Sequence, residues 1–229
     1  MKYYNLTSSR NRKEIGKKPQ SETGNQGDIQ QDFMPWEGKI DFDFKLPEPY
    51  LEKRAKQVSF LDVAFIHPYR FLVLDDSLLS FFKKFNLGSY QDWKINTWQN
   101  KELIKKYNLF LLNDTKQEEY IDFSKSEFLI GKLGDWRDRT IRKPVDIKSY
   151  TDYVYLKNDL RKTKDKKRLR YNKVVFDLSN TTEDMFRLVN APLGGYFVSE
   201  RLKNAIEKNG FTGMDFKEVS ELDKVEVQI

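Results

Sequence analysis

The sequence predicts an α+β fold in one domain over residues 1–229. Short apolar or alternating runs recur between Gly, Pro, Asn and Asp residues, a pattern typical of short strands. Two stretches instead place apolar residues at the i, i+3, i+4 spacing of an amphipathic helix. We therefore expect many short, mostly antiparallel strands with two or three short helices, divisible into sub-lobes 33–130 and 131–229.

The amino-acid composition limits the kinds of core and functional site that the chain can form. The chain has 17 Phe, 12 Tyr and 4 Trp, which favours a core packed from aromatic side chains. It has no Cys, which excludes disulfides, thiolate zinc sites and thiol nucleophiles. We find no apolar run near the length of about 18 residues that spans a membrane, and no apolar secretory signal at the start. We expect a cytoplasmic protein without membrane contact.

The N-terminal part begins with a strand at 2–6. Residues 7–31 are rich in Ser, Asn, Lys, Gln and Gly, with Ile15 and Ile29 their only large apolar residues. We expect a flexible polar loop here, because such a segment buries too little to order itself. Alternation predicts a strand at 42–44, and 58–66 is apolar enough for a buried strand or connector.

Two similar strand–helix–strand units follow in the chain. The first unit is a strand at 71–74, the N-cap Asp75, a helix that ends at Phe85 and a strand at 93–95. The second unit is a strand at 195–198, the N-cap Ser199 and a helix to Lys208, which ends in a glycine turn at Asn209-Gly210. Aligned on the caps, Leu74, Leu78 and Phe82 match Val198, Leu202 and Ile206. The match fits a duplication or the recurrence of a common local solution.

Further strands are predicted at 107–113, 120–123, 128–130, 153–156, 174–178 and 225–229, the last as an edge strand. The strands at 153–156 and 174–178 flank a basic segment, which we expect to be the long charged tip of a hairpin.

That basic segment, 157–173, dominates the charge of the chain. It holds nine Lys and Arg against two Asp, a net +7, so the rest of the +6 chain carries −1. Such a segment binds phosphates or an acidic protein face, or it is simply solvated. The candidate residues here are Lys164, Lys166, Lys167, Arg168 and Arg170, with Tyr171 the one stacking residue. A second candidate is the loop with Trp136, Arg137 and Arg139, residue types enriched at binding hot spots.

Catalytic patterns are missing from the sequence. His67 is the only histidine, so a two-histidine metal site is excluded and a structural role is favoured. The pairs Asp41/Asp43 and Asp75/Asp76 are explained by a solvent-facing strand and by helix capping. The glycines match no phosphate-binding loop. We expect no metal, no cofactor and no enzyme activity.

The C-terminal unit also carries a family resemblance. Its run VSERLK at 198–203, followed by Gly210, Thr212-Gly213 and Phe216, resembles the "vSerLk…G.TG..F" ending of a family of immunity proteins from bacterial polymorphic toxin systems, first catalogued as a domain of unknown function. Residues 107–126 are similar to its "yyllnv…iD…S" middle, and 184–188 to its "iFrl" step. The similarity covers roughly residues 70 to 220.

The resemblance implies a cytoplasmic protein, encoded beside a toxin, that neutralises the toxin by direct contact and without catalysis. Residues 7–31 and the basic segment are not part of the family pattern, and a basic immunity protein suits an acidic or non-nuclease toxin. Binding of nucleic acid through 157–173 is the alternative function. The sequence assigns no oligomeric state and does not identify the toxin.

Overall fold

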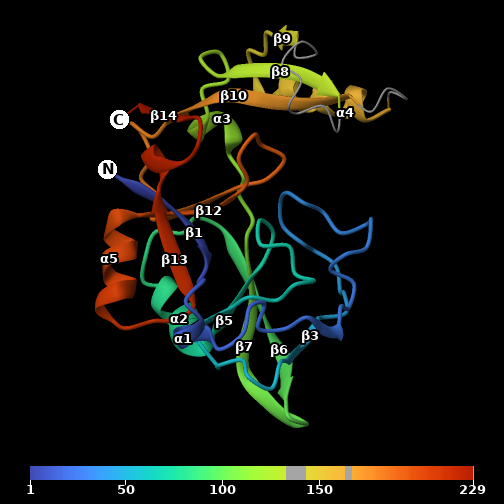
Figure 1. Cartoon of the computed structure of the whole chain (residues 1–229), viewed down its shortest axis with the longest axis vertical. Helices are drawn as coiled ribbons and strands as arrows, with labels where there is room; N and C mark the ends of the chain where they lie inside the picture. The colour runs from blue at the N-terminus through green and yellow to red at the C-terminus, as the bar shows by residue number, and fades with distance from the viewer. Residues whose placement is uncertain (133–142, 163–166, 229) are drawn as a thin grey trace.

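The structure is a computed structural model that describes residues 1–132, 143–162 and 167–228. It confirms the α+β class, with strands arranged in three mostly antiparallel sheets. Figure 1 shows two of these sheets in a lower body, together with helices α2 (Asp76–Phe82) and α5 (Glu200–Lys208). The third sheet and the longest helix, α4 (Tyr150–Lys162), form an upper layer.

A six-stranded sheet forms the centre of the body. Its strands, in spatial order, are β2 (Thr23–Asn25), β3 (Glu48–Leu51), β6 (Tyr90–Gln99), β7 (Glu102–Leu112), β5 (Leu72–Asp75) and β4 (Phe60–Leu61). Alternation along β7 sends Leu109 and Leu111 to one core cluster and Phe110 and Leu112 to another. The sheet is therefore buried on both faces along β7, which explains its unbroken apolar run.

The second sheet brings the two ends of the chain together. Its order is β11 (Met185–Leu188), β12 (Gly195–Ser199), β1 (Tyr3–Ser8) and β13 (Met214–Glu218). Strand β1 pairs antiparallel with both β12 and β13. The N-terminal strand is thus a central strand of a C-terminal sheet.

The two strand–helix–strand units predicted from the sequence are present and have one topology. The first unit comprises β4, β5, α2, β6 and β7, with the sheet order β4-β5-β7-β6; the second comprises β11, β12, α5, β13 and β1, with the order β11-β12-β1-β13. In each unit an antiparallel strand separates the two strands that the helix connects. In the first unit the middle strand is β7, which follows β6 in the chain, whereas in the second unit it is β1, which comes from the N-terminal end of the chain.

The local signals for both helices are confirmed. Asp75 accepts a hydrogen bond from Leu78 N at 2.8 Å, and Ser199 accepts one from Leu202 N at 3.1 Å. Leu78, Phe82, Leu202 and Ile206 all lie in one core cluster. The two helices therefore bury matched faces in a shared core.

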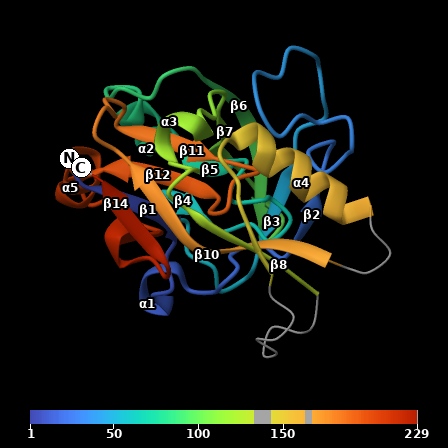
Figure 2. The ribbon, with the colours of Figure 1, turned by 90° about the horizontal axis from the view of Figure 1, so that it is seen from above.

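The upper layer is a sheet covered by α4. Its order is β14 (Val225–Gln228), β10 (Lys167–Asp177), β8 (Glu127–Lys132) and β9 (Lys143–Val145), with the single turns α3 (Gln117–Tyr120) and η2 (Val219–Glu221) beside it. Figure 2 shows α4 crossing above the body from this layer. Strand β14 is an edge strand, as predicted, and runs parallel to β10. The upper sheet does not follow a division at residue 130, because β8 spans that position and pairs with β10.

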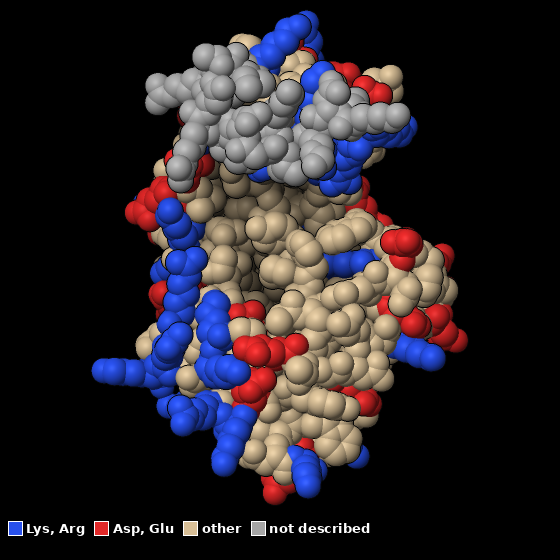
Figure 3. Space-filling view, turned by 45° about the vertical axis from the view of Figure 1, so that its right-hand side comes forward, with Lys and Arg blue, Asp and Glu red and all other residues tan. Residues whose placement is uncertain are grey.

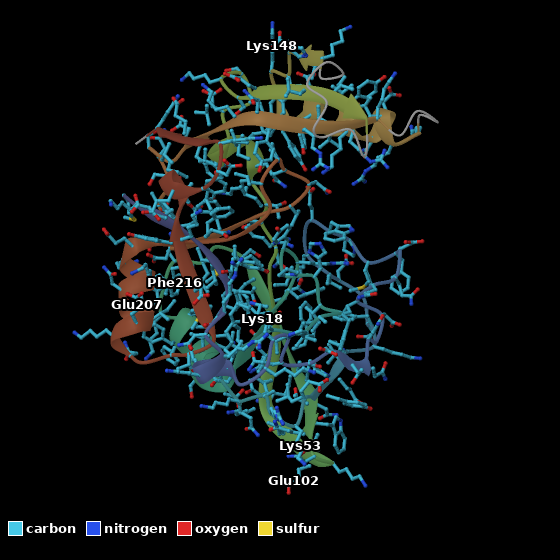
Figure 4. The ribbon with its side chains drawn as sticks, in the orientation of Figure 1. Lys18, Lys53, Glu102, Lys148, Glu207 and Phe216 are labelled. Carbon is cyan, nitrogen blue, oxygen red and sulfur yellow. The ribbon has the colours of Figure 1, made fainter. Side chains whose placement is uncertain are left out.

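The expectation that 7–31 buries too little to order itself was wrong. The segment contains the end of β1, the single turn α1 (Arg12–Ile15) and β2, and both of its large apolar residues, Ile15 and Ile29, are buried. Lys18, labelled near the middle of the body in Figure 4, donates to Ser8 O at 3.0 Å and to Ser8 Oγ at 2.7 Å. Two well-placed isoleucines and backbone contacts thus order a segment of polar composition.

The predicted hairpin around the basic segment was also wrong. Residues 153–156 belong to α4, where Tyr153 and Leu160 are buried two turns apart. Ser149 Oγ accepts from Asp152 N at 3.1 Å, an N-cap contact that the β-branched and aromatic composition of 153–156 obscured. The predicted strand at 42–44 is irregular, and 120–123 contains the end of α3 and an isolated bridge. The segment 58–66 is a buried connector, as predicted, that contains β4 and an isolated bridge at Val63.

Candidate partner-binding surface

Three of the predicted site residues lie together on β10. Lys167, Arg168 and Arg170 face Lys132, Gly131 and Leu129 of β8 in the antiparallel register. The other candidates, Trp136, Arg137, Arg139, Lys164 and Lys166, lie outside the described residues. The basic segment is therefore divided between the end of α4 and the start of β10, and β10 is its described basic strand.

Lys157, at the helical end of the basic segment, is held by the protein. Its Nζ donates to Asn190 O at 3.2 Å and lies 5.3 Å from the centre of the Tyr153 ring. Burial, and then the nearby Arg161, lower the pKa of Lys157. This lysine thus connects α4 to the loop before β12 and is not a solvated charge.

Exposed aromatic side chains form a surface on the loops beside β10. The rings of Trp36 and His67 meet edge to face at 4.9 Å, and those of His67 and Tyr69 at 5.1 Å. Trp36 is 43% exposed and Tyr69 is 44% exposed. Phe33 and Phe42, also exposed, pair at 5.9 Å on the same long loop. We call Trp36, His67 and Tyr69 the aromatic surface.

A tight turn positions His67 and Tyr69. Arg70 N and Phe71 N both donate to His67 O, at 2.9 and 3.1 Å, and Tyr69 N donates to His67 Nδ1 at 3.3 Å. Burial, and then the nearby Arg70 charge, lower the pKa of His67, so the ring is neutral at pH 7. The histidine has a structural role here, but as part of an exposed surface.

Gly194 lets Tyr69 lie flat against the loop before β12. A Cβ at this position would lie 2.6 Å from Tyr69 Cδ2, closer than real contacts allow. The absence of a side chain at Gly194 therefore fixes where the Tyr69 ring can lie.

The Trp36 side of the surface rests on Arg70. This guanidinium donates to Ile29 O at 3.0 Å and to Pro35 O at 2.5 Å, and lies 5.1 Å from the centre of the Trp36 ring. A buried arginine thus connects the turn at 67–70 to the loop that carries Trp36. The two parts of the aromatic surface, far apart in sequence, are held together by this side chain.

Glu37, next to Trp36, connects the aromatic surface to the upper layer. Its Oε1 accepts from Tyr150 Oη and from Asn190 Nδ2, both at 2.8 Å. Burial and the Glu37 hydrogen bond raise the pKa of Tyr150. Tyr69 also interacts electrostatically with Tyr171 of β10. The aromatic surface therefore lies at the boundary between the body and the upper layer.

Figure 3 shows the surface hollowed between the body and the upper layer, with Lys and Arg side chains along the lower edge of that layer. Large exposed aromatic residues beside a charged rim are the composition of protein-binding hot spots.

The sequence pointed only indirectly to the aromatic surface. Trp36 and Tyr69 sit in loops that contain Pro35 and Pro68, and aromatic residues in such loops have no obvious place in a strand or helix. That Arg70 joins these two loops depends on their tertiary packing, which no local pattern reveals.

Within the described ranges, no group of three or more His, Asp or Glu side chains is arranged to hold a metal ion. Nor does any helix of this part of the chain combine the length and apolarity needed to cross a bilayer. No protein-family model matches the sequence, and no curated protein matches it either.

Proposed function

We propose that this protein is a cytoplasmic immunity protein that binds a cognate bacterial toxin and neutralises it by direct contact, without catalysis. The observation that carries the proposal is the aromatic surface. Trp36 and Tyr69 are each more than 40% exposed although Arg70, Glu37 and Gly194 hold them in place. Rigid exposed aromatics lose little conformational entropy on binding. The resemblance of the C-terminal unit to immunity proteins supports the toxin as the partner.

The charge beside this surface favours an acidic partner face. Strand β10 carries Lys167, Arg168 and Arg170 within four successive residues, with Arg168 and Arg170 on one face of the strand and Lys167 on the other. Opposite charge on the toxin would accelerate association and select against basic partners. The proposal therefore includes an acidic patch on the toxin next to an apolar cleft.

The test is a binding and protection assay with the product of the neighbouring toxin gene. Trp36→Ala and Tyr69→Ala should each weaken the complex by about 2 kcal/mol, roughly 30-fold in Kd, as for hot-spot residues. Tyr155→Ala is the matched control, since Tyr155 is an aromatic residue 74% exposed on α4. Equal effects of all three variants, or a toxin that remains active in excess protein, would contradict the proposal.

The same assay separates toxin binding from nucleic-acid binding. The clustering of Lys167, Arg168 and Arg170 on one strand is the feature that favours the alternative. A nucleic-acid site predicts that the logarithm of affinity falls linearly with that of salt concentration, and that neutralising Arg168 and Arg170 lowers the slope by about one per lost phosphate contact. Binding of RNA or DNA that ignores Trp36→Ala would favour this second function.

A further inference from the structure

Two buried arginines lie next to each other beneath the aromatic surface. Arg70 is 3% exposed and Arg187 is 0% exposed. Arg187 Nη1 donates to the backbone oxygens of Tyr69 and Arg70 at 3.5 and 3.4 Å, both long for hydrogen bonds. Among residues 1–132, 143–162 and 167–228, neither guanidinium forms an ion pair with a carboxylate. The interior therefore holds two neighbouring cations that no carboxylate of these ranges pairs with directly, and the charge of Glu37 acts on Arg187 without an ion pair.

Several N–H groups of this pair are also unsatisfied. Arg70 Nε, Arg187 Nε and Arg187 Nη2 have no hydrogen-bond partner in the described part of the chain. Buried charged donors without acceptors are costly, and proteins normally pair them. Burial, and then the charge of Arg187, lower the pKa of Arg70 to about 10, so that Arg70 remains charged at neutral pH.

A pocket of about 320 Å³ borders Arg70, and Arg187 is not among its lining residues. Arg70, Trp36, His67 and Gln31 are among its lining residues. Because His67 Nδ1 accepts from Tyr69 N, the neutral ring carries its proton on Nε2, which is a donor. The volume is at the lower end of the range for small-ligand sites. Asp32, on the same wall, is exposed and solvated.

We propose that this pocket binds a small oxyanion, a phosphate or carboxylate group, against Arg70, where the neighbouring Arg187 adds a second buried positive charge. The anion compensates two buried positive charges whose field is poorly screened by the surrounding protein. The guanidinium of Arg70, the imidazole N–H of His67 and the Gln31 amide supply donors around it. The site is independent of the identity of the toxin.

The arginine side-chain Nε–H signals in ¹H–¹⁵N NMR spectra of the full chain test the site directly. Inorganic phosphate, titrated at constant ionic strength against sodium chloride, should shift the Arg70 and Arg187 signals with saturation in the millimolar range. The Arg201 signal is an internal control, because its Nε already donates to Asp184 at 3.0 Å. Assignment comes from the Arg70→Lys and Arg187→Lys spectra.

A substitution that supplies the anion from the protein itself provides a second readout. Gln31→Glu changes an exposed residue and places a carboxylate on the pocket wall. It should raise Tm and abolish the phosphate response. Gln26→Glu, the same change at an exposed position outside the pocket lining, should do neither.

Acetate replaces phosphate in a parallel titration. A saturable shift with either oxyanion that Gln31→Glu removes and Gln26→Glu preserves supports the site. The proposal is overturned if neither oxyanion shifts the two buried signals more than chloride does, or if Gln31→Glu leaves the response intact.

Discussion

The two strand–helix–strand units have the same topology but stabilise the start of their helix differently. In the first unit the cap is a carboxylate, Asp75, which accepts from Leu78 N. In the second unit the cap is the hydroxyl of Ser199, which also donates to the buried Asp184 at 2.7 Å. A local side chain is enough for the first helix, whereas the second depends on a residue 15 positions earlier in the chain.

Asp184 connects the two units. Its carboxylate also accepts from Arg201, through Nε and Nη2, and from Asn86 N at 3.0 Å, just after the helix of the first unit. Asp184 N in turn donates to Asn86 O at 2.7 Å, and Ser199 N donates to Asp184 O at 2.8 Å. The same N-cap geometry is therefore satisfied by a local side chain in the first unit, whereas in the second unit it is part of a hydrogen-bond network between distant segments.

The largest expected effect comes from removing that connection. Asp184→Ala leaves Ser199 Oγ and Asn86 N without their acceptor and should lower the free energy of unfolding by about 3 kcal/mol. Asp76→Ala is the matched control in the first unit, since Asp76 contacts Lys94 and Asn108 but its side chain is 56% exposed; it should cost less than about 1 kcal/mol. Urea denaturation measures both. Equal losses would mean that Asp184 does not connect the units.

Acid should weaken this connection progressively. Burial disfavours the Asp184 carboxylate, but hydrogen bonds from Arg201, Ser199 and Asn86 outweigh it and lower its pKa below 3.8. A carboxylate whose pKa is lower in the folded state stabilises the fold at pH values above its unfolded-state pKa. This stabilisation is lost as the pH falls through its folded-state pKa. The stability difference between the wild type and Asp184→Asn should therefore shrink as pH is lowered from 5 to 2. A constant difference across that range would contradict the prediction.

The two caps should differ in cost when removed. Asp75→Ala should lower stability by about 1 kcal/mol, the usual value for a lost N-cap. Ser199→Ala should cost about 2 kcal/mol, because Asp184 loses a donor as well. Thermal and urea unfolding of the two variants, alone and combined with Asp184→Ala, measure the coupling. Additive effects of Ser199→Ala and Asp184→Ala would show that the network is not cooperative.

The smallest effect is expected on the outer side of α5, where Figure 4 labels Glu207. Lys203 Nζ lies 2.8 Å from Glu207 Oε2, an i, i+4 pair, and packs over the rings of Tyr4 and Phe216. Glu207→Gln should cost about 0.3 kcal/mol, and added salt should reduce the difference. A loss above 1 kcal/mol would mean that the pair has a tertiary role.

Local chemistry in the sequence determined the α+β class, both capped helices and the apolar strand β7. Each of these depends on neighbours within about one turn or on strand alternation, so residues such as Asp75, Leu78, Ser199 and Leu202 carry the signal themselves. For residues 153–156 the local pattern is misleading, because Tyr and Val favour a strand whereas the N-cap at Ser149 starts a helix. It also missed the order of 7–31, which depends on where Ile15 and Ile29 find a core.

Only the tertiary structure decided which strand completes each unit and where the candidate binding surface lies. The pairing of β1 between β12 and β13, the Asp184 connection and the Arg70 contact with the Trp36 loop all join segments far apart in the chain. Such contacts form because buried donors, charges and apolar faces must be satisfied by whatever the fold brings near them. Sequence patterns show which groups need a partner once they are buried, and the folded chain determines which residues supply that partner.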